Sequence, residues 1–193
     1  MSKILSSERL SLTPVTVADV DVAIEMFTDP AVGKYIGGVM EESAIRREMW
    51  TWIKRGGDGC IGIWCISNQA TEDKLGSVFL LPMPIHEDDT NWDHVKPGVM
   101  PKEDVEIGYI LKRTAWGQGY ATEVCRRLLR FAFEETPLEE VVATFDDANL
   151  TSKQVLRKAG LSCRGRRLAY GEDSPDWRIT RSQWLALGAA GRR

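Results

Sequence analysis

The sequence predicts an α/β (α+β) fold, a single domain built on one mixed β-sheet. Two apolar, β-branched runs with a polar segment between them predict an antiparallel hairpin over residues 60–83. Residues 105–145 then follow a strand–turn–helix–strand pattern, which is typical of a right-handed crossover between parallel strands. The length of 193 residues is that of one compact domain, and no repeat or linker divides it.

The N-terminal elements follow from alternation and helical spacing. Residues 7–15 alternate and predict a strand. Thr16 stands three residues before Asp19, a spacing typical of the capping box at a helix start. Apolar residues at helical spacing continue to Phe27, where an Asp-Pro pair is expected to end the helix. A second helix is expected over residues 45–53, ended by two glycines.

A proline-punctuated loop separates the hairpin from the crossover unit. Residues 82–104 contain four prolines, both histidines and many acidic residues. Loops longer than about 12–15 residues in compact domains are usually functional lids, binding loops or disordered segments. We therefore interpret residues 82–104 as a loop inserted into the domain.

The C-terminal half begins with the most regular helix pattern. Its apolar positions at i, i+3, i+4, i+7, i+8 and i+11 predict one buried stripe; they are Ala121, Val124, Cys125, Leu128, Leu129 and Ala132. A short strand is expected over residues 141–145, and a short helix over residues 149–159 with Gly160 as its left-handed end. Residues 161–170 and 177–180 are expected to be closing strands.

Composition excludes several classes of protein. Lys and Arg total 25 against 28 for Asp and Glu, so there is no basic excess of the kind that DNA binding requires. No apolar run approaches about 18 residues, and the N-terminus has no hydrophobic signal core, so we expect no membrane span and a cytoplasmic protein. The four cysteines form no C-x-x-C pair and are expected to be buried, inert thiols.

The sharpest feature is the turn Trp116-Gly117-Gln118-Gly119-Tyr120-Ala121, between the strand and the long helix. Glycines allow a tight turn and a close approach of a ligand. The first amides of the helix have no intrahelical partner and carry the positive end of its dipole, which suits a phosphate. The alternative is a turn that uses glycine for its geometry alone. Neither the P-loop nor the Rossmann glycine pattern fits.

Residues 106–111 and 116–123 together resemble the acetyl-CoA motif of the GNAT superfamily of N-acetyltransferases. Gly119 and Ala121 match the motif, and Trp116 replaces its leading Arg or Gln, as in the branch of ribosomal-protein N-terminal acetyltransferases. Residues 149–161 resemble the N-x-x-S-x-x-V-L-x-K-x-G-F pattern of that branch. The resemblance covers a core of about residues 8–184, so residues 1–193 are expected to be one N-acetyltransferase domain with the loop 82–104 inserted.

The resemblance implies a mixed central sheet with a splayed parallel strand pair, flanked by helices. Backbone groups at the splay would bind pantetheine, the glycine turn would bind pyrophosphate, and the start of the following helix would contact pantetheine and the thioester. The implied acetyl-CoA contacts are Ile110, Leu111, Lys112, Trp116, Gly117, Gln118, Gly119, Tyr120, Ala121, Thr122, Asn149 and Ser152. For Asn149 an ordinary helix cap is the alternative.

Acetyl transfer to nitrogen needs a neutral amine, so a general base is required. Glu106, at the start of the motif strand, is the candidate, with a solvent-facing carboxylate as the alternative. Many members of the superfamily use a Tyr seven residues after the Asn as general acid, but Leu156 stands there, so Ser152 or water would donate to the leaving thiolate. Glu123 is expected to be structural, because a carboxylate in the first turn favours the helix dipole.

The resemblance implies direct transfer from acetyl-CoA to a primary amine in a ternary complex. The acceptor is left open between a protein N-terminus, which the branch resemblance favours slightly, and a small amine such as an antibiotic, polyamine or amino acid, and a non-catalytic acyl-CoA-binding module is a further alternative. Acidic residues 87–93 could attract a cationic amine or could simply be a solvated loop. The spacing of His86 and His94 matches no standard metal site, so no metal is expected. Homodimers are common in the family, and a dimer is possible.

Overall fold

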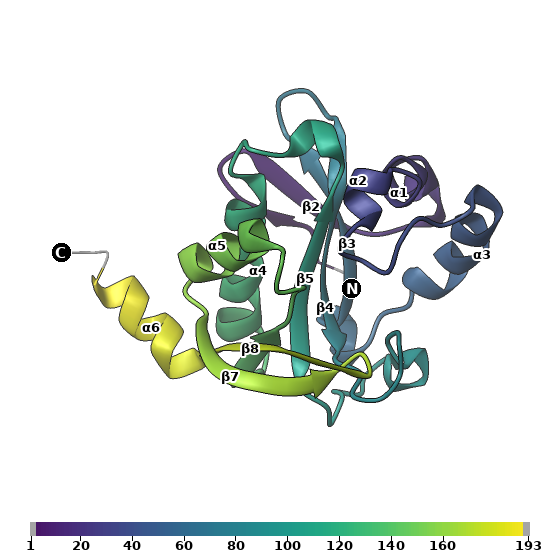
Figure 1. Cartoon of the computed structure of the whole chain (residues 1–193). Coiled ribbons are helices and arrows are strands. Elements are labelled where there is room, and N and C mark those ends of the chain that lie inside the picture. The colour runs from purple at the N-terminus through teal and green to yellow at the C-terminus, as the bar shows by residue number, and fades with distance from the viewer. Residues whose placement is uncertain (1–2, 191–193) are drawn as a thin grey trace.

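The computed structural model describes residues 3–190 and contains an eight-stranded mixed sheet in the order β1-β2-β3-β4-β5-β6-β8-β7 (Figure 1). The strands are β1 (Leu5–Ser6), β2 (Leu10–Pro14), β3 (Gly62–Asn68), β4 (Lys74–Pro82), β5 (Val105–Leu111), β6 (Glu140–Ala143), β7 (Ser162–Ala169) and β8 (Glu172–Thr180). The β5–β6 pair is parallel, and the other neighbouring strands in the described residues pair antiparallel. The predicted α/β class and mixed sheet are confirmed.

Helices cover both faces of the sheet (Figure 1). They are α1 (Val20–Phe27), α2 (Pro30–Gly33), α3 (Glu42–Trp52), α4 (Tyr120–Glu135), α5 (Leu150–Ala159) and α6 (Arg181–Ala190), with short 3-10 turns η1 (Val17–Asp19), η2 (Gly57–Gly59), η3 (Trp92–His94) and η4 (Arg113–Ala115). Helices α4 and α5 lie on one side of β5 and α1–α3 on the other, so β5 is central to the molecule. None of the described helices is long and apolar enough to cross a membrane.

The predicted capping box starts the first helix. The Thr16 amide and hydroxyl both donate to the Asp19 carboxylate, at 2.8 and 3.0 Å. Asp19 also pairs with Lys74 of β4 at 2.7 Å, which fixes the helix start to the sheet. The Asp-Pro pair that ends α1 also begins the short helix α2, which was not expected from the sequence. Asp29 caps α2, and a proline is tolerated at the first position of a helix.

The predicted stripe of α4 is the centre of the hydrophobic core. Val124, Cys125, Leu128 and Leu129 are completely buried, and Phe131 packs edge-on against Trp64 of β3. This burial fixes α4 as the crossover between β5 and β6. The C-terminal turn of α4 therefore returns the chain to the parallel strand beside β5.

The parallel pair is splayed. β5 and β6 share one register pair, Glu106–Val142, whereas β5 stays paired with β4 as far as Leu111. The edge of β5 beyond Glu106 is thus left open towards the start of α5. This opening is the feature that positions the site described below.

The C-terminal part differs most from the prediction. β8 begins five residues earlier than expected, and the helix α6 was not predicted. The expectation that all four thiols are buried is wrong for Cys163, which is exposed. Cys163 lies on β7, the edge strand of the sheet, which packs almost none of its side chains into the core.

Candidate active site

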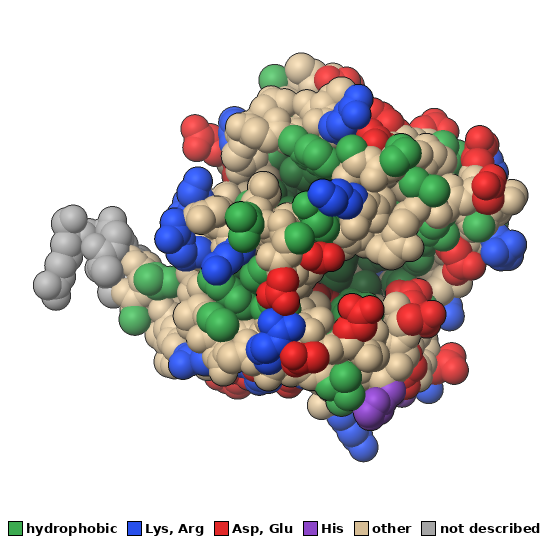
Figure 2. All heavy atoms as spheres, viewed as in Figure 1, with side chains coloured by type: hydrophobic (Ala, Val, Ile, Leu, Met, Phe, Trp, Pro, Cys, Tyr) green, Lys and Arg blue, Asp and Glu red, His purple; other side chains and the backbone are tan. Residues whose placement is uncertain are grey.

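A large cleft of about 1360 Å³ opens on the side of the sheet that carries α1–α3. Its apolar floor includes Phe79 and Ile110 from the sheet and Trp52 from α3. Residues 144–147 after β6, the loop 82–104 and the β7–β8 hairpin complete the wall. Figure 2 shows this hollow with apolar side chains inside it and acidic side chains around its edge.

The cleft is strongly acidic. Basic side chains on its lining are Lys34 and Arg47. The acidic ones are Asp19, Glu48, Asp88, Asp89, Glu106, Asp146, Asp147, Glu172 and Asp173. In the described part of the chain, Asp88, Asp89, Asp146 and Glu172 form no ion pair with a basic side chain. A concave surface with this excess of negative charge attracts cations.

Glu106 lies in the wall of the cleft, at the point where β5 and β6 separate. It is only 4% exposed, so the alternative of a solvent-facing carboxylate is excluded. Burial raises the pKa of Glu106 to about 7, although hydrogen bonds from the Tyr170 hydroxyl and the Thr144 amide and the charge of Arg167 lower it. A carboxylate with a pKa near 7 is suited to accept a proton at neutral pH.

The glycine turn has the open geometry that an anion requires. Gly117 and Gly119 adopt φ values of +74° and +81°, and Gly119 is the N-cap of α4. The Trp116 amide donates to the Arg113 carbonyl at 3.2 Å, and the next amide with a backbone acceptor is that of Glu123, which donates to the Gly119 carbonyl at 3.1 Å. A Cβ atom at Gly117 would meet nothing within 4 Å, so there is open space beside the turn. This cradle fits a pyrophosphate group.

Trp116 has a structural reason to occupy the first position of this turn. Its indole Nε1 donates to the Leu111 carbonyl at 2.8 Å and so fastens the turn to the end of β5. The ring remains 45% exposed, which leaves it beside the open face of the turn.

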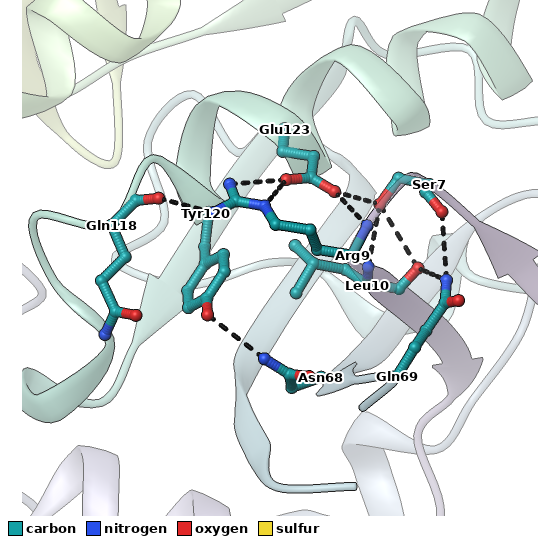
Figure 3. A network of polar contacts seen from close by, with 8 residues as sticks. All are labelled: Ser7, Arg9, Leu10, Asn68, Gln69, Gln118, Tyr120 and Glu123. Carbon is teal, nitrogen blue, oxygen red and sulfur yellow. Dashed lines mark hydrogen bonds and ion pairs between the residues drawn. The ribbon is translucent and has the colours of Figure 1, made fainter. Parts of the chain in front are cut away.

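Arg9 holds the glycine turn from the N-terminal side (Figure 3). Its guanidinium donates to both the Glu123 carboxylate (2.8 Å) and the Gln118 carbonyl (3.1 Å), and it stacks on the Tyr120 ring at 4.6 Å. In a trans peptide the carbonyl and the next N–H point in opposite directions. With the Gln118 carbonyl directed towards Arg9, the Gly119 N–H therefore points away from it.

Glu123 is the anchor of this arrangement. In addition to the hydrogen bond from the Arg9 guanidinium, the Glu123 carboxylate accepts hydrogen bonds from the Ser7 hydroxyl (2.7 Å) and the Arg9 backbone amide (2.9 Å). Burial raises the pKa of Glu123, but these hydrogen bonds together lower it below its ordinary value. Glu123 thus has structural partners, in line with the role expected for it.

The register of β5 changes which residues can present backbone groups at the splay. The Lys112 amide donates to Leu75 of β4 at 3.0 Å, and its carbonyl accepts from Ala115. Backbone groups alternate in direction along a strand, so those of Ile110 also face β4, whereas those of Tyr109 and Leu111 face the splay. The backbone contacts with pantetheine that were expected of Ile110 and Lys112 are therefore expected of Tyr109 instead. The expected contact of Leu111 is unchanged.

The start of α5 faces the same opening. Asn149 caps the helix by accepting the Ser152 amide at 3.1 Å, so the cap expected as its alternative role is present. The Ser152 hydroxyl is 3.0 Å from the Tyr109 hydroxyl. Burial raises the pKa of Tyr109, which keeps its phenol protonated. Tyr109 is not among the residues predicted from the sequence, because only the strand register shows that it reaches α5.

The loop 82–104 contributes directly to the cleft. Asp88, Asp89 and Trp92 are part of its lining, whereas His94 pairs with Glu103 at 3.0 Å. In residues 3–190 no group of three or more His, Cys, Asp or Glu side chains is placed to hold a metal ion.

Comparison with known proteins agrees with this geometry. Residues 9–162 match the family model of the acetyltransferase (GNAT) domain. The chain is 28% identical to the uncharacterized protein YkkB of Bacillus subtilis, with 70% of the chain and 71% of the relative covered. It is 27% identical to the FsC-acetyl coenzyme A-N(2)-transacetylase of Aspergillus fumigatus, with 95% and 78% covered.

Solved structures share the fold. A GNAT-family acetyltransferase from Bacillus anthracis superposes with a TM-score of 0.71 at 19% identity, covering 93% of this chain and 99% of the other. A spermidine N-acetyltransferase from Vibrio cholerae gives 0.69 at 15% identity, with 93% and 99% covered. A ribosomal-protein alpha-N-acetyltransferase in complex with coenzyme A gives 0.70 at 15%, with 92% and 98% covered. The chain therefore belongs to the GNAT family and is an acetyl-CoA-dependent acetyltransferase.

Proposed function

We propose that this acetyltransferase transfers acetyl directly from acetyl-CoA to the primary amine of a small cationic acceptor, with Glu106 as the base. The observation that carries the proposal is the acidic cleft with one buried carboxyl of pKa about 7 in its wall. An ammonium group is attracted by the rim, and one proton must be removed before its nitrogen can attack.

Acetyl-CoA enters from the opposite side of β5. The amides of the turn, from Gly117 to Thr122, bind the pyrophosphate, and the open backbone groups of Tyr109 together with the Leu111 amide bind pantetheine, with Asn149 nearby. This brings the thioester to the splay, between Ser152 and Glu106. The support for this placement is that the turn amides have no backbone acceptor, that the edge of β5 beyond Glu106 is unpaired, and that Ser152 at the start of α5 lies 3.0 Å from the Tyr109 hydroxyl of β5.

The reaction then needs two proton transfers. Glu106 accepts one proton from the ammonium group and releases it to solvent, and the neutral nitrogen then attacks the thioester carbon and forms the C–N bond. The C–S bond breaks and the thiolate takes the proton of the Ser152 hydroxyl, which is reprotonated through Tyr109 or solvent by the second proton that the nitrogen loses. The Ser–Tyr pair thus replaces the acid that Leu156 cannot provide.

A protein N-terminus remains the second candidate acceptor, because residues 149–161 resemble the branch that acts on ribosomal proteins. The cleft distinguishes the two. A protein terminus brings one ammonium group on a neutral peptide backbone, whereas the unpaired carboxylates Asp88, Asp89, Asp146 and Glu172 favour an acceptor with several positive charges.

Thiol release with an amine panel tests the proposal. The panel contains polyamines, an aminoglycoside, amino acids and peptides with a free α-amine, and Glu106→Gln is compared with Glu139→Gln, an exposed carboxylate that pairs with Arg181. We expect Glu106→Gln to lose about 10²–10⁴-fold in kcat while calorimetry shows unchanged acetyl-CoA binding. Binding without turnover on any amine would instead indicate a non-catalytic acyl-CoA-binding module.

A further inference from the structure

We infer that Tyr170 is a positioning residue for the base: its hydroxyl group orients the Glu106 carboxylate and connects it to the loop 82–104. This inference rests on the proposed role of Glu106. The Tyr170 hydroxyl donates to Oε2 of Glu106 at 2.5 Å, and both groups lie at the wall of the cleft. Hydrogen bonds of this length are typical of a hydroxyl that donates to a carboxylate.

The backbone of Tyr170 is held in an unfavourable conformation. Tyr170 and Gly171 form the two-residue turn between β7 and β8, with φ values of +54° and +72°. Such turns favour Asn-Gly or Gly-Gly, because a bulky residue is disfavoured at positive φ. A tyrosine here is costly for the turn itself, and this kind of strain is found mainly where a side chain has a function.

The loop 82–104 holds the same turn from outside. The Tyr170 amide donates to the Pro84 carbonyl at 3.2 Å and the Gly171 amide to the Ile85 carbonyl at 2.9 Å. Thr90, from further along the loop, is buried beside the Tyr170 phenol, and its side chain lowers the pKa of that phenol against the effect of burial. The loop thus fixes the backbone of the residue that contacts the base and lies against its hydroxyl group.

The surroundings of Glu106 both raise and lower the pKa of its carboxyl group. Arg167 of β7 and the Thr144 amide stabilise the carboxylate, and Arg167 is shared with Asp104 and Asp176. Asp89 of the loop faces Tyr170. Burial raises the pKa of Glu106 to about 7 even with Tyr170 present. Without the hydroxyl donor, more of Glu106 would be protonated at neutral pH and unable to accept a proton.

Tyr170→Phe tests the inference, because it keeps the ring and removes the hydroxyl. We expect the acidic limb of the pH profile of kcat/KM to move to higher pH by about one unit, so that kcat/KM falls about tenfold at acidic pH. At high pH the rates should be near normal, and acetyl-CoA binding should be unchanged. A ¹³C titration of the Glu106 carboxyl in the unliganded protein should show the same shift. Leu168→Ala, an exposed change on the same hairpin, should leave the limb in place.

Thr90→Val provides a second variant that does not alter the strained turn, and it should move the limb in the same direction by less. If both variants fold and neither the limb nor the carboxyl titration moves, the inference is wrong. This outcome is distinct from failure of the proposed function, which would appear as full activity in Glu106→Gln.

Discussion

The Arg9 network offers the most quantitative test of how the glycine turn works. Arg9→Met removes the ion pair with Glu123, the bond to the Gln118 carbonyl and the stack on Tyr120, but keeps an apolar side chain (Figure 3). The Arg9 side chain is 44% exposed and that of Glu123 17%. The pair therefore lies between a surface ion pair, worth about 0–1 kcal/mol, and a fully buried charged hydrogen bond, worth about 1.5–3 kcal/mol.

We take about 1.5 kcal/mol for the ion pair and about 0.5 kcal/mol for the stack on Tyr120. The free energy of unfolding should then fall by about 2 kcal/mol, which lowers the Tm of a chain of this size by about 4–8 °C. The loss of orientation at the Gly119 amide should weaken acetyl-CoA binding about tenfold, the equivalent of one hydrogen bond to an anion.

Calorimetry with two thioesters separates these effects. Acetyl-CoA contains the pyrophosphate, whereas acetyl-pantetheine does not, so only the first should bind more weakly to Arg9→Met. Arg9→Lys serves as the control that keeps the charge and loses the forked geometry. Equal weakening of both ligands, or of neither, would refute the idea that Arg9 acts by aiming the turn amides.

The remaining predictions concern charge, backbone and pH. Asp88→Asn with Asp89→Asn should raise KM about tenfold for a polycationic amine and much less for a monocationic one, measured by thiol release at low salt. Gly119→Val places a β-branched residue at φ +81° and should abolish acetyl-CoA binding in calorimetry. The pKa of Glu106 is raised to about 7, so the native protein favours the protonated, neutral form of this side chain. The contribution of Glu106 to the free energy of unfolding is therefore complete below about pH 4.5 and is lost as the pH rises through 7. Glu106→Gln should therefore gain about 2.5 kcal/mol in free energy of unfolding relative to wild type between pH 5 and pH 8 in urea unfolding. An equal stability difference at both pH values would contradict the raised pKa. Trp116→Phe removes the bond to Leu111 and should lower the free energy of unfolding by about 1 kcal/mol in the same assay.

Features that depend on neighbours in sequence could be predicted from the sequence. The capping box at Thr16, the buried stripe of α4, the hairpin and the crossover all follow from spacing, because helix and strand periods place such residues on one side of one element. The glycine turn belongs to the same class, since positive φ and unpartnered helix amides are local properties. These local patterns were sufficient to indicate both the fold and the family.

Tertiary structure decided how separate segments meet. Strand register determined that Tyr109, and not Ile110, faces the splay, because a shift of one residue reverses every backbone group along a strand. Helix α6 has apolar residues all round and no clear stripe, so its sequence gave little indication of a helix.

The sequence by itself indicated the family, a candidate acetyl-CoA turn and Glu106 as the candidate base. Only the tertiary structure raised the pKa of Glu106, since that shift comes from burial beneath a hairpin more than 60 residues away. It also decided that the acidic loop and the residues after β6 form one rim. Desolvation and electrostatic fields depend on distance in space, and sequence spacing carries no measure of that distance for segments joined through a packed core.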